Sequence, residues 1–136
     1  MEQTHVAGKR KEATARVTIK PGNGTIRINS LVFEAYMPKA ARERIRQVFI
    51  LADGHVDLSK LDILFSVDGG GVMGQAEAIA CALARGLVKH SKSDQLHDII
   101  VKYDRTLIAG DHRQTEVHKP SQSSKGPRHK RQKSYR

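Results

Sequence analysis

The sequence predicts an α+β domain, in which helices back a mixed β-sheet, followed by an extended basic tail. Apolar and polar residues alternate with period two near the N-terminus, which predicts strands. Apolar residues recur at helical spacing over much of the remaining body. Residues 117–136 hold seven Lys or Arg and no acidic residue. Because so polar a segment cannot offset its ordering entropy by burial, we expect a globular domain at 1–116 and an intrinsically disordered tail at 117–136.

The charge distribution also separates the body from the tail. The 136-residue chain has a formal net charge of +10, and residues 1–116 hold 17 Lys or Arg against 14 Asp or Glu. Most of the excess lies in the tail, which favours a nucleic-acid partner that orders it. No run approaches the ~20 apolar residues that span a bilayer, and the N-terminus shows no signal-peptide pattern, so we expect no membrane partner. A single cysteine allows no internal disulfide, which fits a cytoplasmic protein.

Three strands are expected in the first thirty residues. The first, His5–Lys11, is weakly patterned, and the second, Ala15–Lys20, alternates clearly. The alternation resumes at 25–29, after the four-residue loop 21–24 of Pro, Gly, Asn and Gly. Alternation on both sides of such a loop predicts a β-hairpin. One face of this hairpin would pack on a core, and the other would present Arg16, Lys20 and Arg27.

The rest of the body alternates between helices and one apolar strand. Residues 31–38 read as a connection with a short helical turn around Glu34. Helices are expected at 39–52, from about residue 76 to 88, and at about 93–103, because apolar residues recur there at i, i+3, i+4 and i+7. The apolar run 61–67 predicts a buried central strand.

The three glycines Gly69, Gly70 and Gly71 lie between that strand and the long helix. Glycine permits positive φ and close backbone approach, and a helix N-terminus offers unpaired N–H groups, a combination that suits a phosphate. A tight turn with close helix–strand packing explains the same residues equally well. The pattern is neither a Walker P-loop nor the G-x-G-x-x-G of dinucleotide folds.

Basic residues supply a second candidate site. Lys9, Arg10 and Lys11, together with Arg16, could contact phosphates, and we favour this over a solvated strand end. Seven scattered histidines show no metal-site spacing, and Cys81 has no partner cysteine, so we expect no metal and no cofactor. No nucleophile, acid and base converge in a catalytic motif, which predicts no enzymatic activity. The polar group Asp111, Arg113 and Glu116 predicts a salt-linked junction where the tail leaves the body.

Several motifs in this order resemble one family over nearly the whole chain. They are Gly8–Val17 (GKRKEATARV), Pro21–Gly24 (PGNG), Gly69–Gly71 with Gly74–Ala76, the Asp111, Arg113 and Glu116 group, and Gln132–Arg136 (QKSYR). Together they resemble the S-nine family of small-subunit ribosomal proteins. The Ser-Tyr-Arg ending resembles the archaeal and eukaryotic branch of the family, and the compact length and the Ser/Pro-rich segment before the end resemble archaeal members.

The resemblance implies a fold and a cellular place. The fold would be that of the second domain of ribosomal protein S-five, with a four-stranded sheet backed by helices and a left-handed βαβ crossover, an exception to the usual rule. The place would be the head of the small subunit, on the 3′ major domain of the ribosomal RNA (rRNA). Proteins S-seven, S-ten and S-fourteen would be neighbours. The tail would thread toward the peptidyl-site tRNA.

Site residues follow from the motifs, the charges and the resemblance. The expected rRNA contacts are Lys9, Arg10, Lys11, Arg16, Gly69, Gly70, Gly71, Gln75, Arg113, Lys119, Lys125, Arg128, Lys130 and Arg131. The resemblance places tRNA contact on Lys133, Tyr135 and Arg136. Two alternatives remain: a small phosphate-binding enzyme with a kinase-like glycine loop, and a free-standing RNA chaperone.

Overall fold

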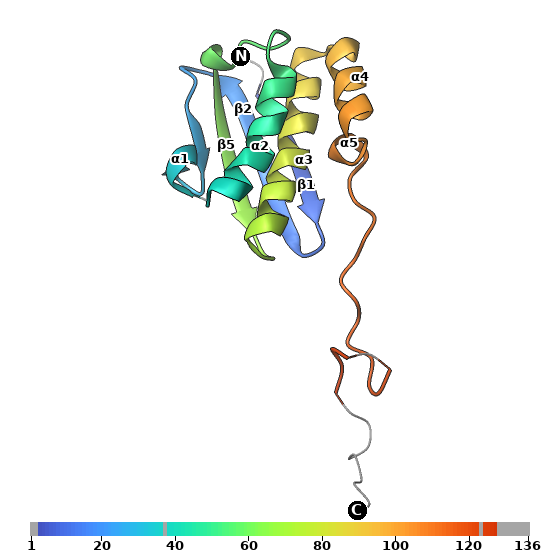
Figure 1. The fold of residues 1–136 in the computed structure, drawn as a ribbon. Coiled ribbons are helices and arrows are strands. Elements are labelled where there is room, and N and C mark those ends of the chain that lie inside the picture. The colour runs from blue at the N-terminus through green and yellow to red at the C-terminus, as the bar shows by residue number, and fades with distance from the viewer. Residues whose placement is uncertain (1–2, 37, 123, 128–136) are drawn as a thin grey trace, which may run out of the picture.

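The computed structural model describes residues 3–36, 38–122 and 124–127. Its elements (Figure 1) are β1 (Thr4–Arg10), β2 (Ala13–Pro21), β3 (Ile26–Ile28), β4 (Leu31–Val32), α1 (Phe33–Tyr36), α2 (Lys39–Ala52), a 3-10 turn (Leu58–Lys60), β5 (Leu61–Asp68), α3 (Val72–Ser91), α4 (Asp94–Tyr103) and α5 (Thr106–Ala109). The α+β class is confirmed. Helix α2 has the expected bounds, while α5 was not expected, because four residues are too few to show a helical period.

The sheet is mixed and has the order β1-β2-β5-β3-β4. Strand β5 is central, antiparallel to β2 and parallel to β3. Within the described residues the sheet has five strands where the resemblance implies four, because the two-residue β4 pairs with β3 at the edge. Strand β4 lies in the segment expected to be a connection, and α1 is the expected helical turn around Glu34.

The expected hairpin between β2 and β3 is wrong. Strand β5 lies between them, and β2 instead forms a hairpin with β1. The loop after β2 wraps around the start of β5, where Asp62 Oδ1 accepts hydrogen bonds from the backbone N–H of Asn23 at 2.9 Å and Thr25 at 3.1 Å. These donors also lower the pKa of Asp62. Period-two alternation identifies which residues share a strand face but not which strand is the neighbour.

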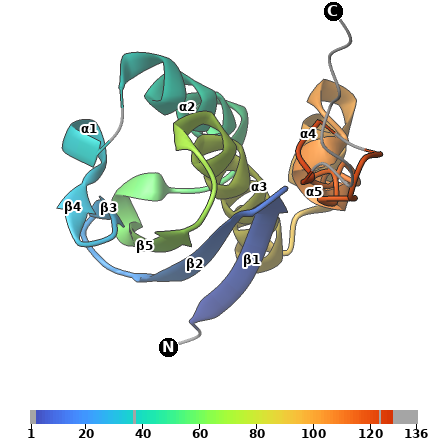
Figure 2. The ribbon, with the colours of Figure 1, turned by 90° about the horizontal axis from the view of Figure 1, so that it is seen from below.

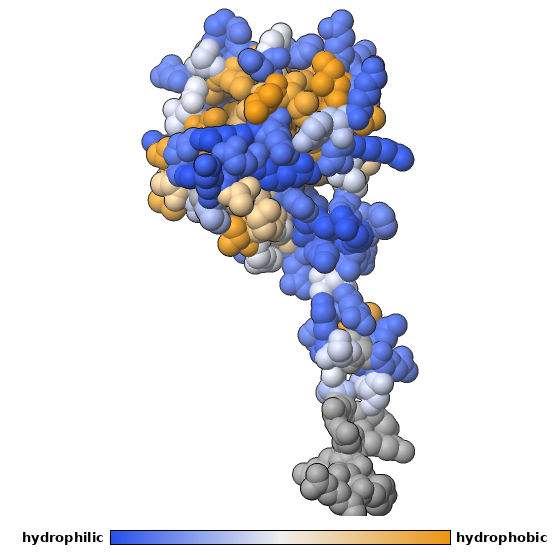
Figure 3. Space-filling view, in the orientation of Figure 1, coloured by the Kyte–Doolittle hydropathy of each residue, from blue (hydrophilic) through white to orange (hydrophobic). Residues whose placement is uncertain are grey.

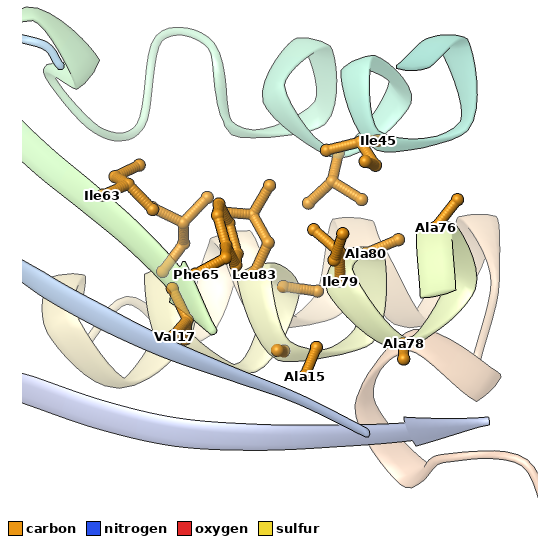
Figure 4. Close-up of a cluster of buried hydrophobic side chains, with 14 of the residues drawn as sticks. Ala15, Val17, Ile45, Ile63, Phe65, Ala76, Ala78, Ile79, Ala80 and Leu83 are labelled. Carbon is orange, nitrogen blue, oxygen red and sulfur yellow. The ribbon is translucent and has the colours of Figure 1, made fainter. Parts of the chain in front are cut away.

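One face of the sheet carries the hydrophobic core, covered by α2 and α3 (Figures 1 and 2). Figure 4 shows side chains of β2 and β5 meeting α3, with Val17 and Phe65 near Leu83. All three are buried, and Ile45 of α2 closes the core from above α3. The exposed residues of β2 and β5 alternate with these, so they lie on the opposite face of the sheet.

Helix α3 lies unusually close to β1. A Cβ added at Gly8 would stand 2.4 Å from the carbonyl oxygen of Ala78 and 2.5 Å from the nitrogen of Ala82. Only glycine on the strand, facing alanines on the helix, permits this separation. The close packing fixes the N-terminal end of α3 relative to the β1–β2 turn.

After α5, described residues 110–122 and 124–127 contain no helix or strand. They run away from the body (Figure 1), and their side chains are mostly hydrophilic (Figure 3). Among the helices of the described residues, none combines the length and apolar character that crossing a bilayer requires.

Candidate nucleic-acid interface

The glycine loop, Gly69–Gly71, joins β5 to α3. Gly69 and Gly70 have φ of 72° and 68°, where side chains other than glycine are strained. A Cβ at Gly69 would also lie 2.5 Å from the carbonyl oxygen of Glu12 in the β1–β2 turn. These two glycines therefore serve a tight turn and close packing. Gly71 differs, since nothing lies within 4 Å of a Cβ added there.

Hydrogen bonds of Asn29, Tyr36 and Gln75 hold the end of β5 and the glycine loop in place. Asn29 binds both backbone groups of Val67, accepting from its N–H at 2.8 Å and donating to its carbonyl at 3.0 Å. The Tyr36 hydroxyl donates to Gln75 Oε1 at 3.2 Å, and Gln75 Nε2 donates to the carbonyl of Gly69 at 3.1 Å. The amide oxygen and the amide nitrogen of Gln75 thus both have hydrogen-bond partners within the protein. Sequence reasoning missed Asn29 and Tyr36, whose partners are distant in sequence.

The β1–β2 end of the molecule also carries an ion-pair network. Arg10 contacts Glu77 of α3 through Nε and lies 2.8 Å from Asp111 Oδ2 through Nη1. Asp111 further accepts from Arg113 Nε at 3.0 Å and Nη2 at 2.7 Å. The hydrogen bonds from Arg113 hold the pKa of Asp111 far below its usual range. The expected salt-linked junction is confirmed for Asp111 and Arg113, but Glu116 has no such contact among the described residues.

The structure divides the N-terminal cations between the two faces of the sheet. Arg10 points to the helix side and pairs with α3, while Arg16 alternates onto the opposite side. Lys9 is exposed at the edge strand β1, where it lines cavities with Cys81 and with Arg85. Lys11 lies in the β1–β2 turn with φ of 53°. A cavity of about 560 Å³ brings part of the expected site together. It is lined by Arg10, Lys11, Glu12, Gly70, Gly71, Met73, Gly74, Glu77, Thr115, His118 and Lys125.

The opposite side of the sheet carries a second groove, of about 1000 Å³. We call this surface the open face and define it by His5, Arg16, Thr18, Arg27, Leu64 and Ser66. Thr18 Oγ1 lies 3.0 Å from His5 Nδ1 across the β1–β2 pair. Arg27 comes from the strand expected to present it, and it shares this groove with Arg16.

The expected tail contacts are only partly within the described residues. Lys119 and Lys125 are exposed in the segment after α5. The remaining predicted contacts lie outside the described residues: Arg128, Lys130, Arg131, Lys133, Tyr135 and Arg136.

The described residues offer no cluster of three or more His, Cys, Asp or Glu side chains that could hold a metal ion. Cys81 is buried on α3, and burial raises the pKa of its thiol. It is therefore a packing residue with little thiolate character.

The fold and its charges define a small basic α+β domain with a cationic extension, the class in which proteins that bind polyanions are found. The family model for "Ribosomal protein S9/S16" matches residues 8–136. The chain is also 46% identical to "Small ribosomal subunit protein uS9" of Methanococcus maripaludis (strain C7), and 43% identical to the protein of that name from Methanococcus vannielii. Each match covers 136 residues and 100% of both chains. The chain therefore belongs to the ribosomal protein S9/S16 family of the small subunit.

Proposed function

We propose that this chain binds small-subunit rRNA in the head of the subunit, on the 3′ major domain, beside the counterparts of S-seven, S-ten and S-fourteen. Its place of action is then the cytoplasm, within the assembled small subunit. The body anchors the protein, and residues 117–136 enter folded RNA where a globular surface cannot. The role is structural, and the protein is not an enzyme.

The observation that carries this proposal is the separation of charge. Residues 117–136 hold seven Lys or Arg with no acidic residue. Folded RNA crowds phosphates together, and extended cationic arms neutralise them. If the tail neutralises about seven phosphates, log K falls against log salt with a slope of roughly −5 to −6.

The contacts sort into three groups. Lys9, Lys11 and Arg16 of the body and Lys119, Lys125, Arg128, Lys130 and Arg131 of the tail contact rRNA phosphates. Arg10, Arg113, Gly69, Gly70 and Gln75 act mainly by shaping the rRNA-facing surface, since their polar groups or backbone are engaged within the protein. Gly71 remains a direct phosphate contact. Lys133, Tyr135 and Arg136 reach the peptidyl-site tRNA.

Removing the last three residues, 134–136, tests the division between anchor and tip. We expect subunits that assemble normally but lose peptidyl-site tRNA faster, because one charged hydrogen bond contributes about 1.5–3 kcal/mol. Sedimentation measures assembly, and dissociation of labelled tRNA from purified subunits measures the tip. A truncated chain that fails to assemble contradicts this division.

The two alternatives predict different behaviour. A kinase-like enzyme needs the glycine loop for a nucleotide, but Gly69 and Gly70 are already required by the turn and by packing on the β1–β2 turn. ATP binding by the purified chain would support it. A free-standing RNA chaperone would not co-sediment with small subunits in high-magnesium buffer, as a ribosomal protein must.

A further inference from the structure

We infer that the open face is a second RNA-binding surface, separate from the tail, which takes an unpaired stretch of rRNA across β1, β2, β5 and β3. The inference rests on the proposed function and names a site within it. Helices α2 and α3 cover only the other face of the sheet, as Figure 2 shows. No acidic side chain among the described residues lines the groove itself, although Asp62 and Asp68 of β5 lie on the same face of the sheet, two residues beyond Leu64 and Ser66.

The state of the arginines distinguishes this face from the rest of the body. In six of them, the guanidinium contacts an acidic side chain or a backbone carbonyl: Arg10, Arg42, Arg44, Arg46, Arg85 and Arg113. Arg16, Arg27 and Arg105 have no such contact within the described residues, and the first two share one groove. The guanidiniums of Arg16 and Arg27, each with five N–H donors, therefore have no acidic or carbonyl acceptor within the described residues.

The sheet register sets the spacing of these two arginines. Arg16 pairs with Ser66, while Thr18 and Arg27 both pair with Leu64. Arg27 is therefore two strands away from Arg16 and offset by two residues, which places the Cα atoms about 12 Å apart at ~4.8 Å per strand and ~3.3 Å per residue. Two guanidiniums at this separation can bind different phosphates of one strand.

The other residues of the open face suit binding to a nucleotide chain better than binding to a protein. The row His5, Thr18, Leu64 and Arg27 crosses four strands, following the register. Imidazole and guanidinium planes stack on unpaired bases, and hydroxyls such as that of Thr18 bind 2′-hydroxyl or phosphate oxygens. Val6, Ala7, Val17 and Phe65 also line the groove, but Val6, Val17 and Phe65 pack toward the core, so the apolar surface left at Ala7 and Leu64 is small for the centre of a stable protein interface. The charge therefore selects RNA, with arginine as its phosphate ligand.

The test uses the full chain and a transcript of the 3′ major domain of archaeal small-subunit rRNA. The variant carries Arg16→Gln and Arg27→Gln, and the matched control carries Arg42→Gln and Arg46→Gln, which removes the same charge from α2. We expect the open-face variant to bind roughly tenfold more weakly or worse. Its salt slope should become shallower by about 1.4, for two phosphate contacts to a single strand. The control should keep the wild-type slope. Thermal unfolding shows whether each variant is folded. We expect the open-face variant to fold, because Arg16 and Arg27 are exposed; the control also loses the ion pairs of Arg42 and Arg46 with Glu34, so its melting temperature is measured beside it.

Three results overturn the inference and remain distinguishable. In the first, the folded open-face variant binds the transcript with wild-type affinity and salt slope, and deletion of residues 117–136 abolishes binding. The open face is then not an RNA-binding surface, and the proposed function still holds. Normal transcript binding with failed assembly beside the head proteins makes this face a protein contact instead. If the wild-type chain itself does not bind the transcript, the proposed function fails with the inference.

Discussion

The glycine loop and the open face both adjoin β5, but they differ in how far their polar groups are satisfied within the protein. At the loop, Gln75 and Asn29 bind backbone groups, and Arg10 nearby is paired with two carboxylates. On the open face, the guanidiniums of Arg16 and Arg27 have no acceptor within the described residues. The loop is therefore largely an internal structure, whereas the open face presents unused binding capacity.

The contrast between the loop and the open face shows that a prominent sequence motif need not be a binding site. Glycine clusters attract attention as phosphate sites, but a glycine can be required by φ and by neighbouring backbone alone. A solvated strand face is rarely considered a binding site, because polar residues alternate on the uncovered face of any sheet that is covered on one side. In this protein, the surface that can bind a ligand is the one whose arginine side chains lack partners within the described part of the chain, whether or not its sequence forms a motif.

The largest expected effect concerns the loop. Gly69→Ala should destabilise the protein by about 3 kcal/mol or more, because it adds left-handed backbone strain to overpacking against the carbonyl of Glu12. Urea unfolding measures the change. An unchanged free energy of unfolding would mean that the turn relaxes easily, and the loop would no longer count as an internal structure.

Gly71→Ala is the matched control within the same loop. Gly71 has no positive φ and nothing within 4 Å of an added Cβ, so stability should change by less than about 0.5 kcal/mol. Weaker transcript binding by this stable variant would show that Gly71 does admit a phosphate. Only Gly69 and Gly70 would then count as internal structure of the loop.

The next effect concerns the hydrogen bonds behind the loop. Asn29 has φ of 47°, so Asn29→Gly keeps the backbone conformation accessible while removing both bonds to Val67. We expect a loss of about 1–3 kcal/mol, because backbone groups of β5 are left unpaired. Urea unfolding again provides the measurement, with Asn23→Gly as a control, since the Asn23 bond to Asp62 uses only its backbone. Equal effects of both variants would contradict the special role of Asn29.

The sequence predicts the elements of this fold much better than their partners. Helix α2 and strand β5 follow directly from periodicity and apolar content, because each depends on local spacing. The pairing of β5 with both β2 and β3 depends on contacts such as that of Asp62 with the loop after β2, which no period records.

The candidate site divides in the same way. The cations of residues 9–16 were found by composition, but alternation turns Arg10 toward α3 and Arg16 toward the open face. The role of Arg27 beside Arg16 depends on β5 lying between their strands, which contradicts the expected hairpin. The sequence already placed Arg16 and Arg27 on one exposed face, but the observed strand order sets them two strands apart instead of on adjacent strands.

The smallest expected effect concerns the base of the tail. Asp111→Asn removes the carboxylate that joins Arg10 to Arg113, so the segment after α5 should open locally while the core stays intact. Faster tryptic cleavage after Arg113, with little change in global unfolding, is the expected result. Asp98→Asn is the control, because Asp98 is exposed and pairs only with His97 among the described residues. The depressed pKa of Asp111 predicts that the wild-type contact persists well below the ordinary carboxyl range and is lost only in strong acid. An unchanged cleavage rate in the variant would mean that the junction is held by other contacts, and the tail would leave the body without a salt-linked anchor.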